Sequence, residues 1–192
     1  GFDGNLGNGT FNSSNFPVDP TGLSSGVLDI QAGGQQTACA LVTGGGVKCW
    51  SENLGNGTGG SSLVPVDVLG LTSGASAIKS CSNYNCAIVN GAVKCWGSNS
   101  FGRLGNGTTT TTANAPVDVP GLTNVTALAS DSAAGFSTCA LTSNGNVYCW
   151  GSNSSLHLGI PVNRFIPNTV LSALNSSAFA PLVRRCFQFG LL

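Results

Sequence analysis

The stretch Cys86-Ala-Ile-Val-Asn-Gly-Ala-Val-Lys-Cys95-Trp96-Gly97 decides the fold of this chain. Two short apolar runs flank Asn90-Gly91, the pair that best fills a two-residue type I′ turn, because both of its residues need a positive φ. Pairing outward from this turn places Cys86 opposite Cys95. Opposed residues at a non-hydrogen-bonded site of an antiparallel pair lie about 4.5 Å apart at Cα, which is within disulfide range. The stretch therefore predicts a β-hairpin closed by a disulfide.

The hairpin occurs in two further copies, each with one more residue in its turn, as a three-residue turn with a left-handed glycine requires. These copies run from Cys39 to Trp50 and from Cys139 to Trp150. Two other motifs recur with them: Leu-Gly-Asn-Gly-Thr at 6–10, 54–58 and 104–108, and Pro-Val-Asp at 17–19, 65–67 and 116–118. The copies of Leu-Gly-Asn-Gly-Thr are 48 and 50 residues apart, a period typical of propeller blades or repeat arrays.

These motifs, with Cys-Ala-Leu, Cys-Trp-Gly-Ser-Asn and Gly-Arg-Leu-Gly-Asn-Gly-Thr, resemble the regulator of chromosome condensation repeat family, particularly its secreted-looking versions with paired cysteines. The resemblance covers residues 1–159. It implies a β-propeller in which each repeat forms one blade of about four antiparallel strands. The chain departs from the family pattern in two places. Members often carry His just before the first Cys, where this chain has Thr37, Tyr84 and Ser137, and Arg103 stands where the family has Gln.

We therefore expect an all-β fold, a β-propeller-like array of about three to four blades that is incomplete as a closed propeller. Residues 1–159 are predicted to hold three repeats, with boundaries near 50, 97 and 151, and residues 160–192 a degenerate fourth repeat or a strand-donating tail. Propellers need about four to eight blades to close. Two blade faces and two sheet edges should therefore stay open and need a cover. The candidates are further repeats on a longer parent chain, other copies that close a ring, or copies added head to tail into a fibre.

The composition favours an extracellular or cell-surface protein. Only 7% of the 192 residues are charged and the formal net charge is zero, whereas about a quarter of the residues are charged in an average domain. Such a surface has little charge repulsion, so we expect sugars or self-assembly to cover it. The eight cysteines indicate an oxidising compartment. The chain has no apolar run of membrane-spanning length, so no membrane span is expected.

The cysteines are predicted to be structural. Six of them form the hairpin pairs Cys39–Cys49, Cys86–Cys95 and Cys139–Cys149. The remaining two, Cys81 and Cys186, are predicted to pair with each other because this gives an even count, and the alternative is a bridge from each to another chain. Zinc is disfavoured, since the spacing is not Cys-x-x-Cys and the only histidine is His157.

No catalytic residue, cofactor site or nucleic-acid site is expected. Enzymes with acid–base or nucleophilic chemistry need titratable groups in pairs, and here no such pair is visible. Asp19, Asp67 and Asp118 share one repeat position, which predicts residues that cap backbone donors at turns or strand ends. The glycine-rich stretches lack the Lys-Ser/Thr of a phosphate loop. Nucleic-acid binding needs clustered basic residues, and Arg184-Arg185 is the single basic doublet.

Seven sequons make asparagine-linked glycans an expected modification. They lie at Asn8, Asn12, Asn56, Asn106, Asn124, Asn153 and Asn175. Asn8, Asn56 and Asn106 belong to the repeat's own Leu-Gly-Asn-Gly-Thr turn. The uncharged surface favours glycosylation of some of these residues.

Two functions remain open. The first is an extracellular, non-enzymatic scaffold that self-assembles through its open propeller edges, into a ring or a fibre, with Phe187 to Leu192 donated as a strand to a neighbouring copy. The second is a secreted recognition module that binds a protein or glycan through loops on one propeller face, where Asn99, Phe101 and Arg103 would project. Concentration-dependent assembly favours the first function, and a monomer with loop-dependent binding favours the second.

Overall fold

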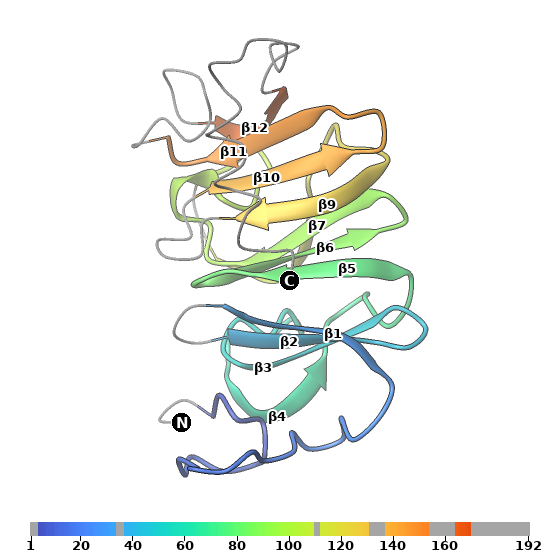
Figure 1. The fold of residues 1–192 in the computed structure, drawn as a ribbon. Helices are drawn as coiled ribbons and strands as arrows, with labels where there is room; N and C mark the ends of the chain where they lie inside the picture. The colour runs from blue at the N-terminus through green and yellow to red at the C-terminus, as the bar shows by residue number, and fades with distance from the viewer. Residues whose placement is uncertain (1–3, 34–36, 110–111, 131–136, 154–163, 170–192) are drawn as a thin grey trace.

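The structure is a computed structural model that describes residues 4–33, 37–109, 112–130, 137–153 and 164–169. Over these residues the chain forms three four-stranded antiparallel sheets, which we call the first, second and third blade. Figure 1 shows the blades stacked in chain order, from the blue and teal first blade to the yellow and orange third blade. No sheet closes on itself, so the prediction of an all-β, incomplete propeller-like array is confirmed.

The strands of each blade follow one another in space as they do in sequence. The first blade consists of β1 (Val27–Gly33), β2 (Thr37–Val42), β3 (Gly46–Ser51) and β4 (Ser62–Asp67). The second consists of β5 (Ala75–Ser80), β6 (Tyr84–Val89), β7 (Ala92–Gly97) and β8 (Ala113–Asp118), with a short 3₁₀ turn, η1 (Ser100–Gly102), before β8. The third consists of β9 (Val125–Ser130), β10 (Ser137–Thr142), β11 (Val147–Gly151) and β12 (Arg164–Thr169).

The central hairpin has the predicted register. Asn90 and Gly91 have φ values of 51° and 77°, as a type I′ turn requires. Val89 faces Ala92, and three steps outward Cys86 faces Cys95. The pairing is fixed because two glycine-compatible turn residues leave one way to align the flanking strands.

The three hairpins are each closed by a disulfide between their two central strands. The bridges Cys39–Cys49, Cys86–Cys95 and Cys139–Cys149 join Cα atoms that lie 4.1 Å apart in every case. The half-cystines are buried. Each disulfide is therefore shielded from solvent.

Apolar side chains between successive blades form the core. The first strand of each blade packs on the preceding blade, since β5 contacts β1 and β2, and β9 contacts β5 and β6. One cluster joins the first hairpin to the second blade through residues such as Leu41, Ile78 and Trp96. A second cluster joins the second hairpin to the third blade through Ile88 and Trp150. The core is thus a series of similar contacts between neighbouring blades, as in repeat proteins.

The strand β12 takes the same place in the third blade as β4 and β8 in the others. Tyr148 pairs with Thr169, as Lys48 pairs with Asp67 and Lys94 with Asp118. Residues 160–163 and 170–192 lie outside the described residues, and so do Cys186 and the segment Phe187–Leu192. The predicted strand donation therefore stays a prediction.

The repeated aspartates Asp67 and Asp118 end the strands β4 and β8, as predicted. Their carboxylates form ion pairs with Lys48 and Lys94 on the neighbouring strand, at 2.6 Å and 2.5 Å, which was not predicted from the sequence. Both pairs are partly solvent-exposed cross-strand neighbours. The third blade has neither residue of this Lys–Asp ion pair, because Tyr148 and Thr169 occupy the two positions.

Among the described residues, none of the helical turns has the length and hydropathy that a membrane-crossing helix needs.

Candidate functional site

A tryptophan from each hairpin donates a hydrogen bond to the backbone of the preceding repeat. The indole N–H of Trp96 donates to the Asn53 carbonyl at 3.0 Å, and that of Trp150 to the Arg103 carbonyl at 2.9 Å. Trp50 makes the equivalent bond to the Asn5 carbonyl at 2.9 Å. All three rings are buried. These bonds satisfy buried donors and hold neighbouring repeats together.

The first glycine of Leu-Gly-Asn-Gly-Thr is required by this contact. A Cβ on Gly55 would lie 2.7 Å from the Trp96 ring, and a Cβ on Gly105 would lie 2.6 Å from the Trp150 ring. A Cβ on Gly7 would lie 2.9 Å from the Trp50 ring. The repeat motif therefore encodes the contact between repeats as well as a local turn.

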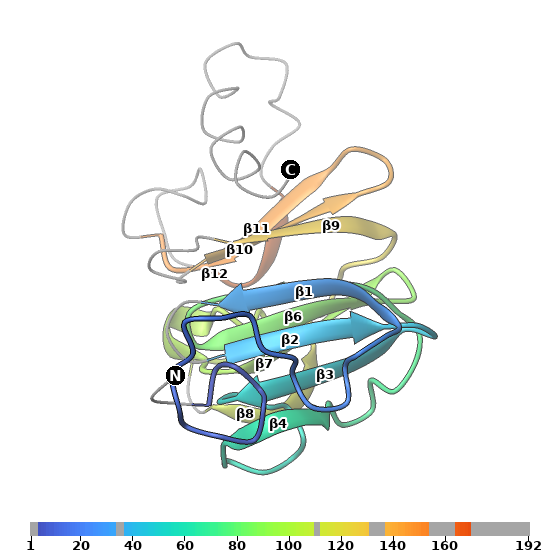
Figure 2. The same ribbon diagram turned by 60° about the horizontal axis from the view of Figure 1, so that its bottom comes forward.

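The segment from Gly4 to Gly26 packs on the outer part of the first blade, in the place that a preceding blade takes on the other two blades. Besides the Asn5 carbonyl, the Gly9 N–H donates to the Leu63 carbonyl at 2.9 Å, and Leu23 packs against Ala38, Ala40 and Trp50. Figure 2 looks towards this face of the first blade and shows the dark blue segment beside β2, β3 and β4. The outer half of the face is covered by the chain itself.

The inner half of the same face, formed by β1, is uncovered. Three residues share one position of the repeat, because each pairs with the central alanine of its hairpin. They are Ile30, Ile78 and Leu128, which pair with Ala40, Ala87 and Ala140. Ile78 is 5% exposed because it packs on the first hairpin, whereas Ile30 is 57% exposed. We call Ile30 and its uncovered surroundings on β1 the β1 face.

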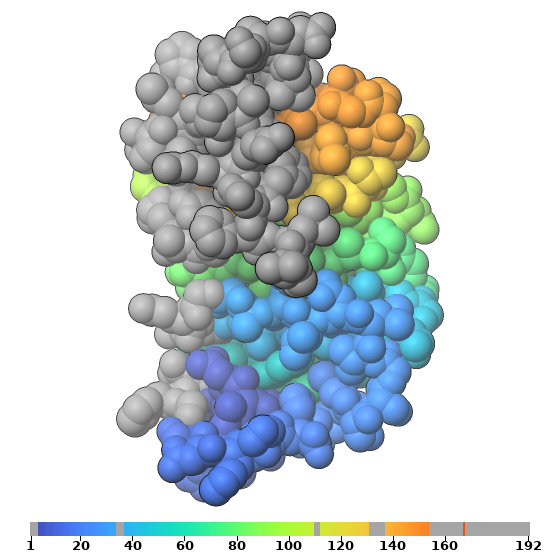
Figure 3. Space-filling view, in the orientation of Figure 1, coloured from blue at the N-terminus to red at the C-terminus, as the bar shows by residue number. Residues whose placement is uncertain are grey.

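Exposed apolar side chains gather at this end of the molecule. Of the eight large apolar side chains that are exposed among the described residues, six lie between residues 11 and 30. They are Phe11, Phe16, Val18, Val27, Leu28 and Ile30. Figure 3 shows this blue region at one end of the stack of blades. A local concentration of exposed apolar surface is typical of an interaction site.

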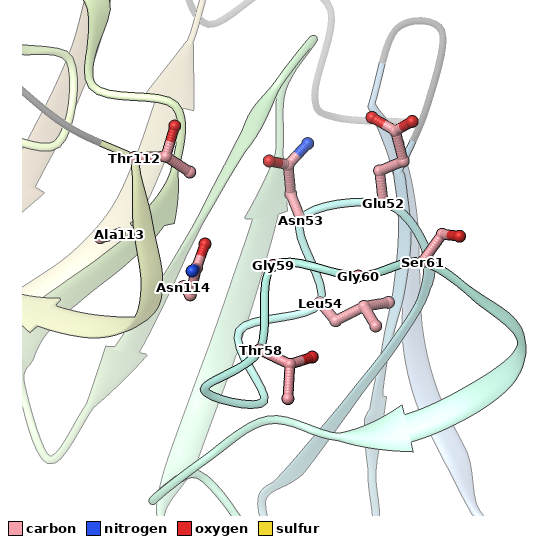
Figure 4. Close-up of a pocket in the computed structure, with 10 residues that line it drawn as sticks. All are labelled: Glu52, Asn53, Leu54, Thr58, Gly59, Gly60, Ser61, Thr112, Ala113 and Asn114. Carbon is pink, nitrogen blue, oxygen red and sulfur yellow. The ribbon is translucent and has the colours of Figure 1, made fainter.

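A polar pocket lies between the outer loops of the first and second blades. Its volume is about 360 Å³. It is lined by Glu52, Asn53, Leu54, Thr58, Gly59, Gly60, Ser61, Thr112, Ala113 and Asn114. In Figure 4 one wall carries Glu52, Asn53 and Ser61 and the other carries Thr112 and Asn114. Hydroxyl, amide and carboxylate groups of this kind bind hydroxyl-rich ligands, but Glu52 has no second acid or histidine beside it for proton transfer.

A backbone hydrogen bond joins the two walls of this pocket. The Gly57 N–H donates to the Asn114 carbonyl at 2.8 Å, which joins the loop of the first blade to the strand β8. The Asn53 carbonyl accepts from both the Trp96 indole and the Asn85 amide, at 3.0 Å and 3.1 Å. The pocket is therefore formed by the contact between blades.

The loop residues that were predicted to project from one propeller face are mostly buried, which corrects that prediction. Asn99 is buried because its amide donates to the Thr108 carbonyl and hydroxyl and its side-chain oxygen accepts from the Leu104 N–H. Arg103 is buried as well, with its guanidinium 5.5 Å from the centre of the Tyr84 ring. Phe101 alone of the three is exposed.

A buried polar cluster lies where the second blade meets the third. The Tyr84 hydroxyl lies 2.8 Å from the Thr138 hydroxyl. Burial raises the pKa of Tyr84 well above its usual range, with a smaller contribution from the nearby Cys81. Burial also lowers the pKa of the Arg103 guanidinium, which still stays charged at neutral pH.

Cys81 belongs to this cluster as a buried free thiol. Its sulfur donates to the Ser130 hydroxyl at 2.8 Å, and burial raises its pKa. The predicted bridge from Cys81 to Cys186 is therefore not formed: the thiol lies in the core cluster between the second and third blades. Cys186 itself lies outside the described residues.

The sequons differ in their surroundings. The side-chain oxygens of Asn8, Asn56 and Asn106 each accept hydrogen bonds from the backbone N–H and the hydroxyl of the threonine two residues further on. Asn12 and Asn124 are exposed, and Asn153 is buried. Asn175 lies outside the described residues. Glycosylation at these positions stays a prediction. No cluster of His, Cys, Asp and Glu suited to a metal ion occurs within the described part of the chain.

Three solved structures with a similar fold are longer than this chain. Human WBSCR16 is 18% identical with a TM-score of 0.69, over 94% of this chain and 48% of its own. Yeast RCC1 (Prp20) bound to Kap60 is 16% identical with a TM-score of 0.67, over 88% of this chain and 42% of its own. Prp20p from Saccharomyces cerevisiae, in a second structure, is 20% identical with a TM-score of 0.60, over 74% and 37%. At such identities the likeness shows the fold alone, and the chain spans about half or less of each structure.

The sequence comparison identifies the repeat. No curated protein matches the chain, but two family models with the description regulator of chromosome condensation (RCC1) repeat match residues 90–141 and 133–155. Residues 90–155 therefore match the RCC1 repeat, as the hairpin and turn motifs predicted, and the described chain has the fold of part of an RCC1-like propeller.

Proposed function

We propose that the chain is a non-enzymatic scaffold of the secreted, cysteine-paired type, which works outside the cell or at its surface and self-assembles into a ring or a fibre. The observation that carries this proposal is the β1 face, where Ile30 is exposed although its equivalents Ile78 and Leu128 pack on a preceding blade. In a repeat protein, an apolar surface of the kind that packs on a preceding blade is expected to bind a partner where no such blade covers it.

The composition and the cysteines support this setting. Three disulfides persist only where the surroundings are not reducing. With 7% charged residues and zero net charge, electrostatic repulsion between copies is weak. Glycans on exposed sequons such as Asn12 and Asn124 would keep the remaining surface soluble.

The similar propellers support a binding role rather than catalysis. Prp20p has binding properties towards Gsp1p and histones, and yeast RCC1 binds Kap60. The pocket between the blades of this chain has a single ionisable residue, Glu52, among its lining. General acid–base catalysis normally needs a second titratable group, so binding is the function that these groups serve best.

Sedimentation velocity over a wide concentration range tests self-assembly. We expect the mean mass of the oxidised, glycosylated chain to rise with concentration. Intact mass spectrometry with and without reduction and deglycosylation measures disulfides and glycans on the same sample. A chain that stays monomeric at every concentration contradicts the proposal.

A second function is favoured by the pocket between the first and second blades. Its hydroxyl, amide and carboxylate groups suit a glycan. Titration with oligosaccharides, followed by NMR, should then shift signals of the wild type but not of Glu52→Gln or Asn114→Ala. A monomer whose binding is lost in these variants would favour recognition over assembly.

A further inference from the structure

We infer that the pocket between the first and second blades binds an N-acetylated sugar, whose acetamido group takes the place that an asparagine side chain fills in the second blade. This inference rests on the second proposed function, glycan recognition, and names the class of sugar. Its basis is a difference between two equivalent loops, which leaves the first blade with amide-binding groups that no side chain of the described chain uses.

The loop after the first hairpin is shorter than the loop after the second. On the first blade Glu52 alone separates the end of β3 from the carbonyl that accepts from the Trp96 indole. On the second blade residues 98–102 separate the end of β7 from the carbonyl that accepts from the Trp150 indole. The first blade therefore has no counterpart of Asn99.

In the second blade the longer loop buries the Asn99 side chain, which is 3% exposed. Its side-chain oxygen accepts from the Leu104 N–H at 3.1 Å. Its side-chain nitrogen donates to the carbonyl and the hydroxyl of Thr108, at 3.2 Å and 2.9 Å. Asn153 stands at the same place after β11 of the third blade and is buried as well. The repeat thus holds a carboxamide at this position.

The first blade has the groups that bind this carboxamide but lacks the asparagine. Leu54 and Thr58 are the counterparts of Leu104 and Thr108 in the repeated Leu-Gly-Asn-Gly-Thr motif. Both residues line the pocket, and Thr58 is exposed. No described side chain binds the Leu54 N–H or the Thr58 carbonyl. The pocket therefore offers a donor and an acceptor that fit an amide from a ligand.

An acetamido sugar matches the rest of the lining. Its amide oxygen can accept from the Leu54 N–H while its amide N–H donates to the Thr58 carbonyl. The ring hydroxyls can then bind Glu52, Ser61 and Asn114, whose side chains lie on the two walls (Figure 4). The pocket volume of about 360 Å³ is typical of small-molecule sites. Its described lining has no Lys or Arg, so the carboxylate of Glu52 disfavours acidic sugars.

Two disaccharides that differ in the acetamido group test the inference. The oxidised chain is titrated by calorimetry with di-N-acetylchitobiose and with cellobiose, which has hydroxyls in place of the acetamido groups. We expect the acetylated disaccharide to bind at least about tenfold more tightly, because only its amide makes the two hydrogen bonds that Asn99 makes in the second blade. Acetamide should compete with it, whereas acetate, which has no N–H donor, should not.

A loop graft is the matched variant. Replacing Glu52 with a copy of residues 98–102 gives the first blade its own asparagine and should abolish binding of the acetylated disaccharide. Circular dichroism and disulfide content establish that this variant is folded, as the second blade already carries the same loop.

The outcomes separate the two levels of the proposal. If neither disaccharide binds, glycan recognition itself is wrong. If both bind equally well, or if the grafted chain binds like the wild type, glycan recognition stands and the amide site is wrong. Binding of an asparagine-containing peptide in place of either disaccharide would assign the site to a protein partner and overturn the sugar.

Discussion

At the residue scale, one glycine per repeat shows how a turn residue can serve a distant contact. Gly55 has a φ of +70° and its missing Cβ leaves room for the Trp96 ring. Left-handed backbone alone would favour glycine or asparagine. The ring of the following blade excludes asparagine as well, because any Cβ would meet it.

We predict that Gly55→Ala destabilises the protein much more than Gly70→Ala. Both positions have a similar positive φ, +70° and +72°, but a Cβ on Gly70 meets nothing within 4 Å. Gly70→Ala should cost about 1 kcal/mol for the backbone alone. Gly55→Ala should cost roughly 3 kcal/mol, since a clash with a buried ring adds about 1–3 kcal/mol. Urea unfolding measures both values, and equal losses would contradict the role assigned to the Trp96 contact.

Tyr84 predicts how stability changes at alkaline pH. Burial raises its pKa in the folded protein, so the folded state keeps the proton when the unfolded state releases it above about pH 10. Stability is therefore complete below about pH 10 and falls as the pH rises towards the folded pKa. Tyr84→Phe should remove this part of the slope in unfolding experiments. The raised pKa of Cys81 also makes stability fall with rising pH, starting at a lower pH, and this part of the slope should remain in Tyr84→Phe. A slope above pH 10 that is unchanged in Tyr84→Phe would assign the effect to other groups.

At the element scale, the hairpin and its disulfide are one unit. The Asn90-Gly91 turn aligns Cys86 with Cys95, and the bridge then fixes the two central strands of the second blade. The outer strand β8 is held more weakly, by ladder bonds and the exposed Lys94–Asp118 pair. Exposed pairs of this kind contribute about 0.2–1 kcal/mol. Blade stability should therefore depend mainly on the hairpin.

We predict that the double variant Cys86→Ala/Cys95→Ala loses about 2.7 kcal/mol of unfolding free energy. The bridge closes a loop with a sequence separation of 9 residues, and the chain-entropy relation for a loop of about this size gives that value. Urea unfolding under non-reducing conditions measures it. Lys94→Ala, the comparison on the same blade, should cost less than about 1 kcal/mol. A disulfide variant as stable as Lys94→Ala would contradict this ranking.

At the scale of the whole molecule, stability is shared between neighbouring blades. Each blade has its own disulfide, but its apolar side chains are buried by the next blade and its tryptophan binds the previous repeat. A defect at one blade contact should therefore spread to the two blades that share it and weaken with distance, as nearest-neighbour coupling in repeat proteins implies.

We predict that Trp96→Phe weakens the contact between the first and second blades by about 2 kcal/mol, because it removes the indole hydrogen bond to the Asn53 carbonyl, which keeps the Asn85 amide as its other donor, and opens a small cavity. Hydrogen exchange measured by mass spectrometry should show faster exchange in β2, β3, β5 and β6. Strands β10 and β11 serve as the internal reference and should change least. Equal acceleration in all three blades would show that the chain unfolds as one cooperative unit instead.

Much of the fold and part of the candidate site could be predicted before any coordinates. The hairpin register depends on two turn residues and on pairs less than a dozen residues apart, so Cys86, Asn90, Gly91 and Cys95 were sufficient for it. The repeated motifs then extended one hairpin to an array. The site was harder to predict. The ion pair of Lys48 with Asp67 links residues 19 apart, and the burial of Asn99 depends on a loop that folds back on it.

The sequence by itself determined the stapled hairpins, the repeat and the unclosed array, because short-range turn chemistry and strand pairing specify them. Only the tertiary structure decided which side chains the blades bury against each other. The tryptophan contacts join residues 43 to 47 positions apart, and Cys81 became a core thiol through its neighbours in two blades. Ile30 and Ile78 have the same residue type and the same repeat position, yet one is exposed and the other is buried. Burial depends on whether another blade is present, and this is why the β1 face could be found only in the assembled fold.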